Sequence, residues 1–171
     1  MELLERFKQG DVDAFEELFR HFQGEVYAWI VRIVRDPSVA EDLTIETFWR
    51  IHKSRARFDT RYAFGAWARR IATNLAIDHM RVRHSEEELV REPAVESADS
   101  ALQMEIRENL QQAFRHLSPK LRAAATLALL EERSYEEIAS AFGKPVGVIR
   151  TRVFRAVRQL RKELERLGLK P

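Results

Sequence analysis

Apolar residues recur at helical spacing along most of the chain. Between Asp11 and Ile33 they fall at intervals of three and four positions, which is typical of a helix that buries one face. The same spacing predicts a helix that starts at Asp36 and another from about Ala63 to Val82. No stretch alternates between apolar and polar residues with the period of two that indicates a half-buried strand. The pattern therefore predicts an all-α fold.

One segment, residues 84–101, interrupts this pattern. It reads HSEEELVREPAVESADSA, with a proline, many acidic or small polar residues and few large apolar groups. Such a segment cannot bury enough apolar surface to offset its conformational entropy. We therefore predict two small helical domains, residues 1–83 and 102–171, joined by an acidic flexible linker at residues 84–101.

The second predicted domain contains the signals of a helix-turn-helix. Ser134 and Glu137 form a capping box at the start of a short helix, and Gly143 supplies the left-handed conformation that a tight turn requires. Pro145 then opens a long helix, residues 146–167. In a helix-turn-helix the second helix enters the DNA major groove through its N-terminal residues. The C-terminal domain is therefore predicted to bind DNA.

The second helix of this motif carries side chains suited to reading DNA. From Lys144 to Arg166 the chain has eight basic and two acidic residues. Arginine can contact a guanine edge through two hydrogen bonds, threonine offers a hydroxyl and a methyl group, and phenylalanine can touch a thymine methyl. A basic helix that only aids solubility or binds a protein partner is the simpler alternative. The face away from the predicted buried stripe includes Arg150, Thr151, Phe154 and Arg155.

Charge is distributed in four blocks of alternating sign, although the net charge of the 171 residues is only +2. Residues 1–49 carry a net charge of −6, residues 50–83 carry +7, residues 84–101 carry −5 and residues 102–171 carry +6. For any single block, the simpler explanation of its charge is a solvent-exposed face of a helix. Two basic blocks separated by an acidic connector favour two contacts with a single polyanion.

The first basic block also contains aromatic residues. They are Phe58, Tyr62, Phe64 and Trp67. Cationic groups beside aromatic rings suit single-stranded DNA, because the cations bind phosphates while the rings stack on unpaired bases. For Phe64 and Trp67 taken alone, a place in the hydrophobic core is the favoured interpretation. Asn74 and Asp78 share one face of the following helix, where either can contact a base edge.

Composition excludes several classes of protein and site. The chain has no cysteine, which rules out disulfides and cysteine-ligated metals, and its five histidines lack the i, i+4 spacing of a helical zinc site. It has no glycine-rich phosphate loop and no serine elbow, so we expect no enzyme activity, metal or cofactor. The longest uncharged apolar stretch, residues 123–130, is far below the roughly 20 residues of a membrane span. With a charged N-terminus that is not a signal peptide, we expect a cytoplasmic protein without direct membrane insertion.

Three stretches, taken in order, resemble the motifs of one known family. Residues 36–49 read DPSVAEDLTIETFW, residues 67–83 read WARRIATNLAIDHMRVR, and residues 117–161 include SYEEIA and PVGVIRTR. These resemble the polymerase-binding helix, the promoter-melting helix and the upstream-promoter domain of the extracytoplasmic-function (ECF) subfamily of bacterial RNA polymerase sigma factors. The resemblance implies a factor that binds core polymerase, recognises the minus-ten and minus-thirty-five promoter elements, melts DNA and initiates transcription of a dedicated regulon.

By position, the resemblance implies three sets of contact residues. Those that face the polymerase are Asp36, Glu41, Asp42, Ile45, Glu46, Phe48 and Trp49. Those at the minus-ten element, where a base of the non-template strand is flipped out of the stack, are Trp67, Asn74, Asp78, Arg81 and Arg83. Those at the minus-thirty-five element are Arg150, Thr151, Arg152, Phe154 and Arg155.

Three positions depart from the family pattern. Ile45 replaces a usual glutamine, Ala128 replaces an arginine that touches phosphate in many members, and Val148 replaces a usual threonine. The resemblance also implies an inhibitory anti-sigma factor as a partner. The alternative function is a stand-alone helix-turn-helix regulator of duplex DNA. It leaves residues 36–83 without a role and requires a dimer to read two half-sites.

Overall fold

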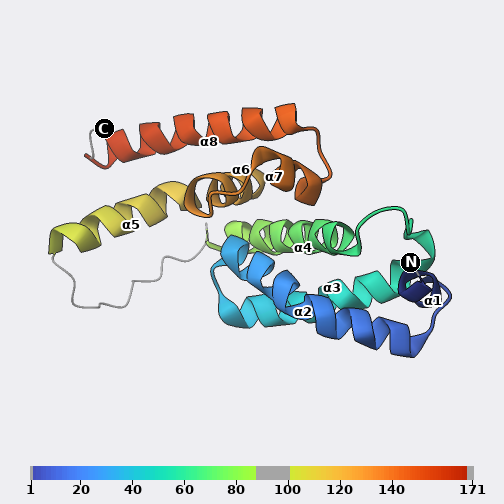
Figure 1. The fold of residues 1–171 in the computed structure, drawn as a ribbon. Helices are drawn as coiled ribbons and strands as arrows, with labels where there is room; N and C mark the ends of the chain where they lie inside the picture. The colour runs from blue at the N-terminus through green and yellow to red at the C-terminus, as the bar shows by residue number, and fades with distance from the viewer. Residues whose placement is uncertain (1, 88–100, 169–171) are drawn as a thin grey trace.

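The computed structural model describes residues 2–87 and 101–168, and this part of the chain consists of helices without a strand. The first half contains α1 (Glu2–Lys8), α2 (Val12–Val34), α3 (Pro37–Ser54), the 3-10 turn η1 (Arg55–Arg57) and α4 (Phe64–Glu87). The second half contains α5 (Ala101–Arg115), α6 (Pro119–Ala125), the π-helical turn η2 (Thr126–Leu130), α7 (Tyr135–Phe142) and α8 (Val146–Arg166). Figure 1 shows α4 lying between α2 on one side and α6 and α7 on the other.

The predicted all-α fold and the helix-turn-helix are confirmed, with differences at element ends. The short helix α1 precedes the first predicted helix. Helix α4 runs on to Glu87, so the first residues of the predicted linker are helical. The rest of that linker, residues 88–100, lies outside the described residues.

Helices α2 and α3 begin where the sequence places a capping aspartate. The Asp11 carboxylate accepts a hydrogen bond from the backbone N–H of Ala14 at 3.1 Å, and α2 follows. The Asp36 carboxylate accepts from the N–H groups of Ser38 and Val39 at 3.0 and 3.2 Å, and α3 follows. Each carboxylate satisfies amides that have no partner within the helix. These local bonds fix where the elements start.

Aromatic side chains fill the core of the first half. Phe7 of α1 stacks on Phe15 of α2 with ring centroids 6.1 Å apart, and it meets Phe64 edge-on at 5.7 Å. Phe58, in the loop before α4, contacts Phe64 at 5.9 Å and stacks on Trp67 at 4.7 Å. The loop is therefore anchored by its own aromatic ring, which fixes the start of α4.

The second half is built around the helix-turn-helix. Gly143 ends α7 with a φ of 58°, the left-handed conformation expected there, and the chain turns directly into α8. Helices α5, α6 and α8 enclose a small apolar cluster of their own. Its buried members are Ala113, Leu117, Ala125, Ala156 and Leu160.

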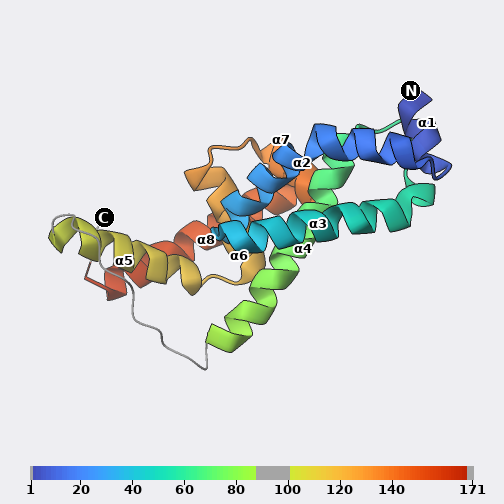
Figure 2. The same cartoon turned by 90° about the horizontal axis from the view of Figure 1, so that it is seen from below.

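The larger apolar cluster extends across both halves. It includes Ile30 of α2 and Ile77 of α4 together with Leu127 of η2 and Ile138 of α7, all of them buried. Helix α4 contacts α6 and α7 as well as α2 and α3 (Figures 1 and 2). The two halves are therefore joined by apolar packing and not only by the connector.

A buried hydrogen bond links α2 to α4 beside this junction. The indole N–H of Trp29 donates to the Thr73 hydroxyl at 2.9 Å, and that hydroxyl donates to the Arg69 carbonyl at 2.7 Å. Thr73→Val should lower the free energy of unfolding by about 1–3 kcal/mol, because it leaves the buried indole N–H without an acceptor.

Thr47→Val is the matched control in chemical denaturation. Thr47 is equally buried, but its hydroxyl bonds only to the Leu43 carbonyl of its own helix. Thr47→Val should therefore lower the free energy of unfolding clearly less than Thr73→Val does. If both variants lost the same free energy of unfolding, the hydrogen bond from Trp29 to Thr73 would contribute no special stability.

Candidate nucleic-acid and protein interfaces

The outer face of α8 carries the residues predicted for the minus-thirty-five element. Ile149 and Val153 are buried against the rest of the second half, which turns the opposite face of the helix outward. Phe154 is 63% exposed although it is a large apolar side chain. An exposed phenylalanine between arginines can touch a thymine methyl while the arginines contact base edges. The exposed members of the predicted set are Arg150, Thr151, Phe154 and Arg155.

Two arginines of this face make cation–π contacts with aromatic rings of α7. The Arg150 guanidinium lies 5.8 Å from the Tyr135 ring centroid, and the Arg152 guanidinium lies 5.5 Å from that of Phe142. Such contacts restrict a long side chain before any ligand arrives. Arg152 is only partly exposed, so of the five predicted residues it projects least from the face.

Helix α4 presents a stripe of polar residues on its solvent side. Asn74, Asp78 and Arg81 are exposed at helical spacing, and Arg81 pairs with Asp78 at 3.4 Å. Arg70 is exposed one turn earlier on the same stripe. Arg70 is not in the predicted minus-ten set, although its spacing of four from Asn74 places it on the same face.

The other two residues predicted for the minus-ten element lie elsewhere. Trp67 is only partly exposed and stacks on Phe58, so it belongs mainly to the aromatic core. Arg83 lies near the end of α4, 3.6 Å from the Asp36 carboxylate at the start of α3. The polar stripe on α4 therefore contains Asn74, Asp78 and Arg81 but not Trp67.

Asp36 joins the start of α3 to the end of α4. The N–H of Val39 holds the pKa of this carboxyl below its usual range, and the Ser38 N–H and Arg83 act in the same direction, while burial opposes them. Asp36 is therefore a capping residue as well as a member of the predicted polymerase face.

Helix α3 exposes two large apolar side chains four residues apart. Ile45 is 66% exposed and Trp49 is 53% exposed. The Lys53 ammonium lies 4.6 Å from the Trp49 ring centroid, and Arg50 pairs with Glu46 at 2.9 Å. An apolar pair rimmed by charges has the composition of a protein interface. The acidic residues predicted on this face are Glu41, Asp42 and Glu46.

Phe48 does not lie on this face, which corrects the prediction that it faces the polymerase. It is 2% exposed and packs edge-on against Phe19 at 4.8 Å and Phe15 at 6.5 Å. The apolar periodicity of α3 requires a core residue at this position.

Among the residues that the structure describes, no group of three or more histidine, aspartate or glutamate side chains is placed to hold a metal ion. Within the same residues, no helix has the length and apolar character to span a bilayer.

Comparison with known sequences identifies relatives over almost the whole chain. The family model for Sigma-70 region 2 matches residues 18–86, and that for Sigma-70, region 4 matches residues 107–160. The RNA polymerase sigma factor CarQ of Myxococcus xanthus is 35% identical over 170 residues, covering 97% of this chain and 98% of that protein. The ECF RNA polymerase sigma factor SigW of Bacillus subtilis is 30% identical over 179 residues, covering 96% of each.

Solved structures share the fold. The sigma factor RpoE of Bartonella quintana, in complex with the anti-sigma factor NepR, aligns with a TM-score of 0.56 at 25% identity, over 90% of this chain and 98% of that chain. CnrH, in complex with the cytosolic domain of CnrY, aligns with a TM-score of 0.58 at 21% identity, over 95% of each chain.

Proposed function

We propose a role for each surface of this chain, which belongs to the ECF subfamily of bacterial RNA polymerase sigma factors and initiates transcription. In this proposal residues 1–83 form the domain that binds core polymerase and the minus-ten element, and residues 102–171 form the domain that binds the minus-thirty-five element. The polymerase performs the chemistry of RNA synthesis, and the sigma factor itself catalyses no reaction. Acting with the polymerase, it works in the cytoplasm.

The exposed apolar pair on α3 is the observation that carries the polymerase assignment. Ile45 and Trp49 have no apolar neighbour that covers them in the described chain, and burying them against a partner releases water from both. The surrounding Glu41, Asp42 and Glu46 suit a basic partner surface and set its orientation. Ile45, in place of the usual glutamine, then contributes an apolar contact.

In this proposal the exposed face of α8 binds the minus-thirty-five element while that element is double-stranded DNA. An arginine can form two hydrogen bonds with a guanine, while Thr151 and Phe154 offer groups for a thymine methyl. An arginine that is already held by an aromatic ring, such as Arg150 by Tyr135, loses less conformational freedom when it binds DNA. The stripe on α4 is assigned to the melted minus-ten element, where Asn74 and Asp78 can bond the Watson–Crick edge of a flipped base and Arg81 a phosphate.

A further partner is an anti-sigma factor. The similar RpoE of Bartonella quintana was solved with such a protein, NepR, and this chain shares its fold over most of both lengths. A stand-alone regulator is not favoured, because relatives named as sigma factors match both halves of the chain.

Purified protein mixed with core polymerase and a library of promoter fragments tests the function directly. The mixture should yield specific transcripts that neither component produces alone. Absence of sigma-dependent transcripts from every fragment would contradict the proposal.

Trp49→Ala should weaken binding to core polymerase by about 2 kcal/mol or more, because a buried tryptophan is often the dominant anchor of an interface. Fluorescence titration of labelled sigma factor with core polymerase measures the change. Val12→Ala is the control, since Val12 is 70% exposed but lies at the start of α2. If both variants bind like the parent protein, α3 is not the docking helix.

Arg150→Ala should weaken recognition of the minus-thirty-five element by about 1–3 kcal/mol through the loss of a base contact. Run-off transcription from a selected promoter, and from one with a scrambled upstream element, reports the difference. Arg161→Ala is the control, because Arg161 is exposed on the same helix about three turns further along. A loss for Arg161→Ala that equals the loss for Arg150→Ala would argue for bulk charge instead of base recognition.

A further inference from the structure

A pocket of about 670 Å³ lies where the end of α2 meets α4, α5, α6 and η2. Pockets that bind small molecules usually have volumes of about 300–1,000 Å³. Helix α8 contributes none of the described residues that line the pocket, and α3 contributes only its N-cap, Asp36. The pocket is therefore distinct from the apolar pair on α3 and from the outer face of α8.

Apolar side chains from several helices form part of the pocket wall. Met80 of α4 is buried, and Phe114 of α5 is partly buried. Leu110 of α5 and Leu130 of η2 line the same pocket but are 38% and 49% exposed. The apolar part of a ligand that covered these two leucines would remove their surface from water, which is favourable.

The pocket wall also carries positive charge. Among the described residues that line it, five are arginines and only one, Asp36, has a carboxylate. Arg35 is paired outside the pocket lining with Glu131, at 2.7 Å. Arg107 and Arg115 of α5 are exposed and form no ion pair with any residue that the structure describes. These two arginines are therefore available to an anion.

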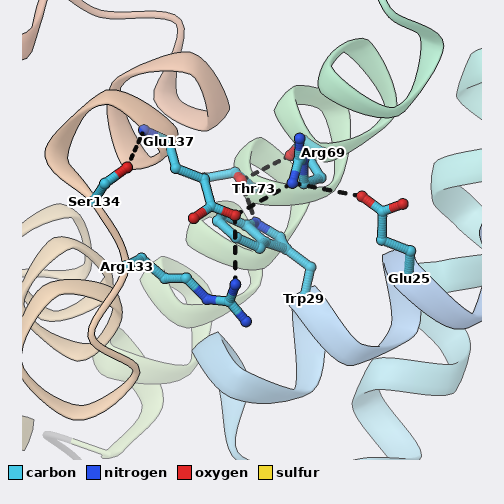
Figure 3. Close-up of polar contacts among 7 residues, drawn as sticks. All are labelled: Glu25, Trp29, Arg69, Thr73, Arg133, Ser134 and Glu137. Carbon is cyan, nitrogen blue, oxygen red and sulfur yellow. Dashed lines mark hydrogen bonds and ion pairs between the residues drawn. The ribbon is translucent and has the colours of Figure 1, made fainter.

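Other arginines between the two halves are matched by a carboxylate. Figure 3 shows Arg69 and Arg133 beside Glu137, and their guanidinium groups lie 3.3 and 3.6 Å from its carboxylate. The described pocket wall has no such partner for Arg107 and Arg115. A carboxylate that entered the pocket would supply the missing charge through strong, charge-assisted hydrogen bonds.

His79 brings an unsatisfied polar atom to the α4 side of the pocket. Its Nε2 atom is buried and has no hydrogen-bond partner within the described part of the chain. Buried polar atoms without a partner are rare in native proteins, because each costs free energy. An anionic oxygen that reached this ring would accept a hydrogen bond from it.

We propose that this pocket binds a small organic anion with an apolar body, of the class of medium-chain carboxylates. The inference goes beyond the polymerase and promoter contacts proposed above, because it gives the sigma factor a ligand of its own. Leu110, Phe114 and Leu130 cover the hydrocarbon chain. Arg107 and Arg115 bind the carboxylate. The combination of an apolar wall with unmatched cations selects this class over neutral or cationic amphiphiles.

Isothermal titration calorimetry of the full chain with dodecanoate, kept below the concentration at which it forms micelles, tests the site. One dodecanoate should bind per chain. Dodecyltrimethylammonium, which has the same tail and a cationic head, should bind about tenfold more weakly. Equal affinity for the two amphiphiles would overturn the proposal. Uptake of many molecules without saturation would also overturn it, because that result indicates an adventitious additive only.

Arg115→Gln tests the anion-binding part of the pocket. It should weaken dodecanoate binding about threefold, as expected for the loss of an exposed ion pair. Arg161→Gln is the matched control, because it removes the same charge from an exposed position of α8 outside the pocket. Equal weakening by the two variants would show an effect of net charge alone and would contradict the assignment of Arg115.

Leu110→Asn tests the apolar part of the pocket. It should weaken dodecanoate binding about tenfold, because the variant no longer buries a leucine against the chain of the ligand. Ile106→Asn is the matched control, since Ile106 is 43% exposed on the same helix but does not line the pocket. Thermal unfolding of each variant verifies that it is folded. Unchanged binding by Leu110→Asn would place the ligand elsewhere and overturn the proposal.

Discussion

The packing of α6 and α7 onto α4 is the contact on which the arrangement of this molecule depends. Buried residues such as Ile77 and Ile138 belong to one apolar cluster, although the acidic connector separates them in the sequence. Arg69, Arg133 and Glu137 add a polar edge to that apolar contact. Partly exposed ion pairs contribute little free energy, so burial of apolar surface supplies most of the attraction while the ion pairs select one orientation.

Helix α4 has two sides with different surroundings. One side of it belongs to the shared core, and the stripe through Asn74 and Asp78 faces solvent. Arg69 and Arg70 lie at the boundary between these sides, where α7 and the turn at Gly143 reach them. The surface proposed for the minus-ten element therefore lies beside the contact between the two halves.

Most helices could be predicted because their signals are local. Asp11, Asp36 and Ser134 cap the helices that follow them, and Gly143 adopts the left-handed turn that its position required. The docking of the halves could not be predicted, because Arg69 and Glu137 are 68 residues apart and leave no periodic pattern. The family motif placed Phe48 among surface residues, whereas its apolar spacing places it in the core.

The separation between the halves, measured in the free protein and on core polymerase, tests the account most directly. The chain has no native cysteine, so Arg20→Cys on α2 and Lys162→Cys on α8, both exposed positions, can be spin-labelled selectively. Pulsed electron paramagnetic resonance should give one narrow distance distribution in the free protein and a distance longer by tens of ångströms on the polymerase–promoter complex. An identical distance in both states, or a broad distance distribution in the free protein, would contradict the account.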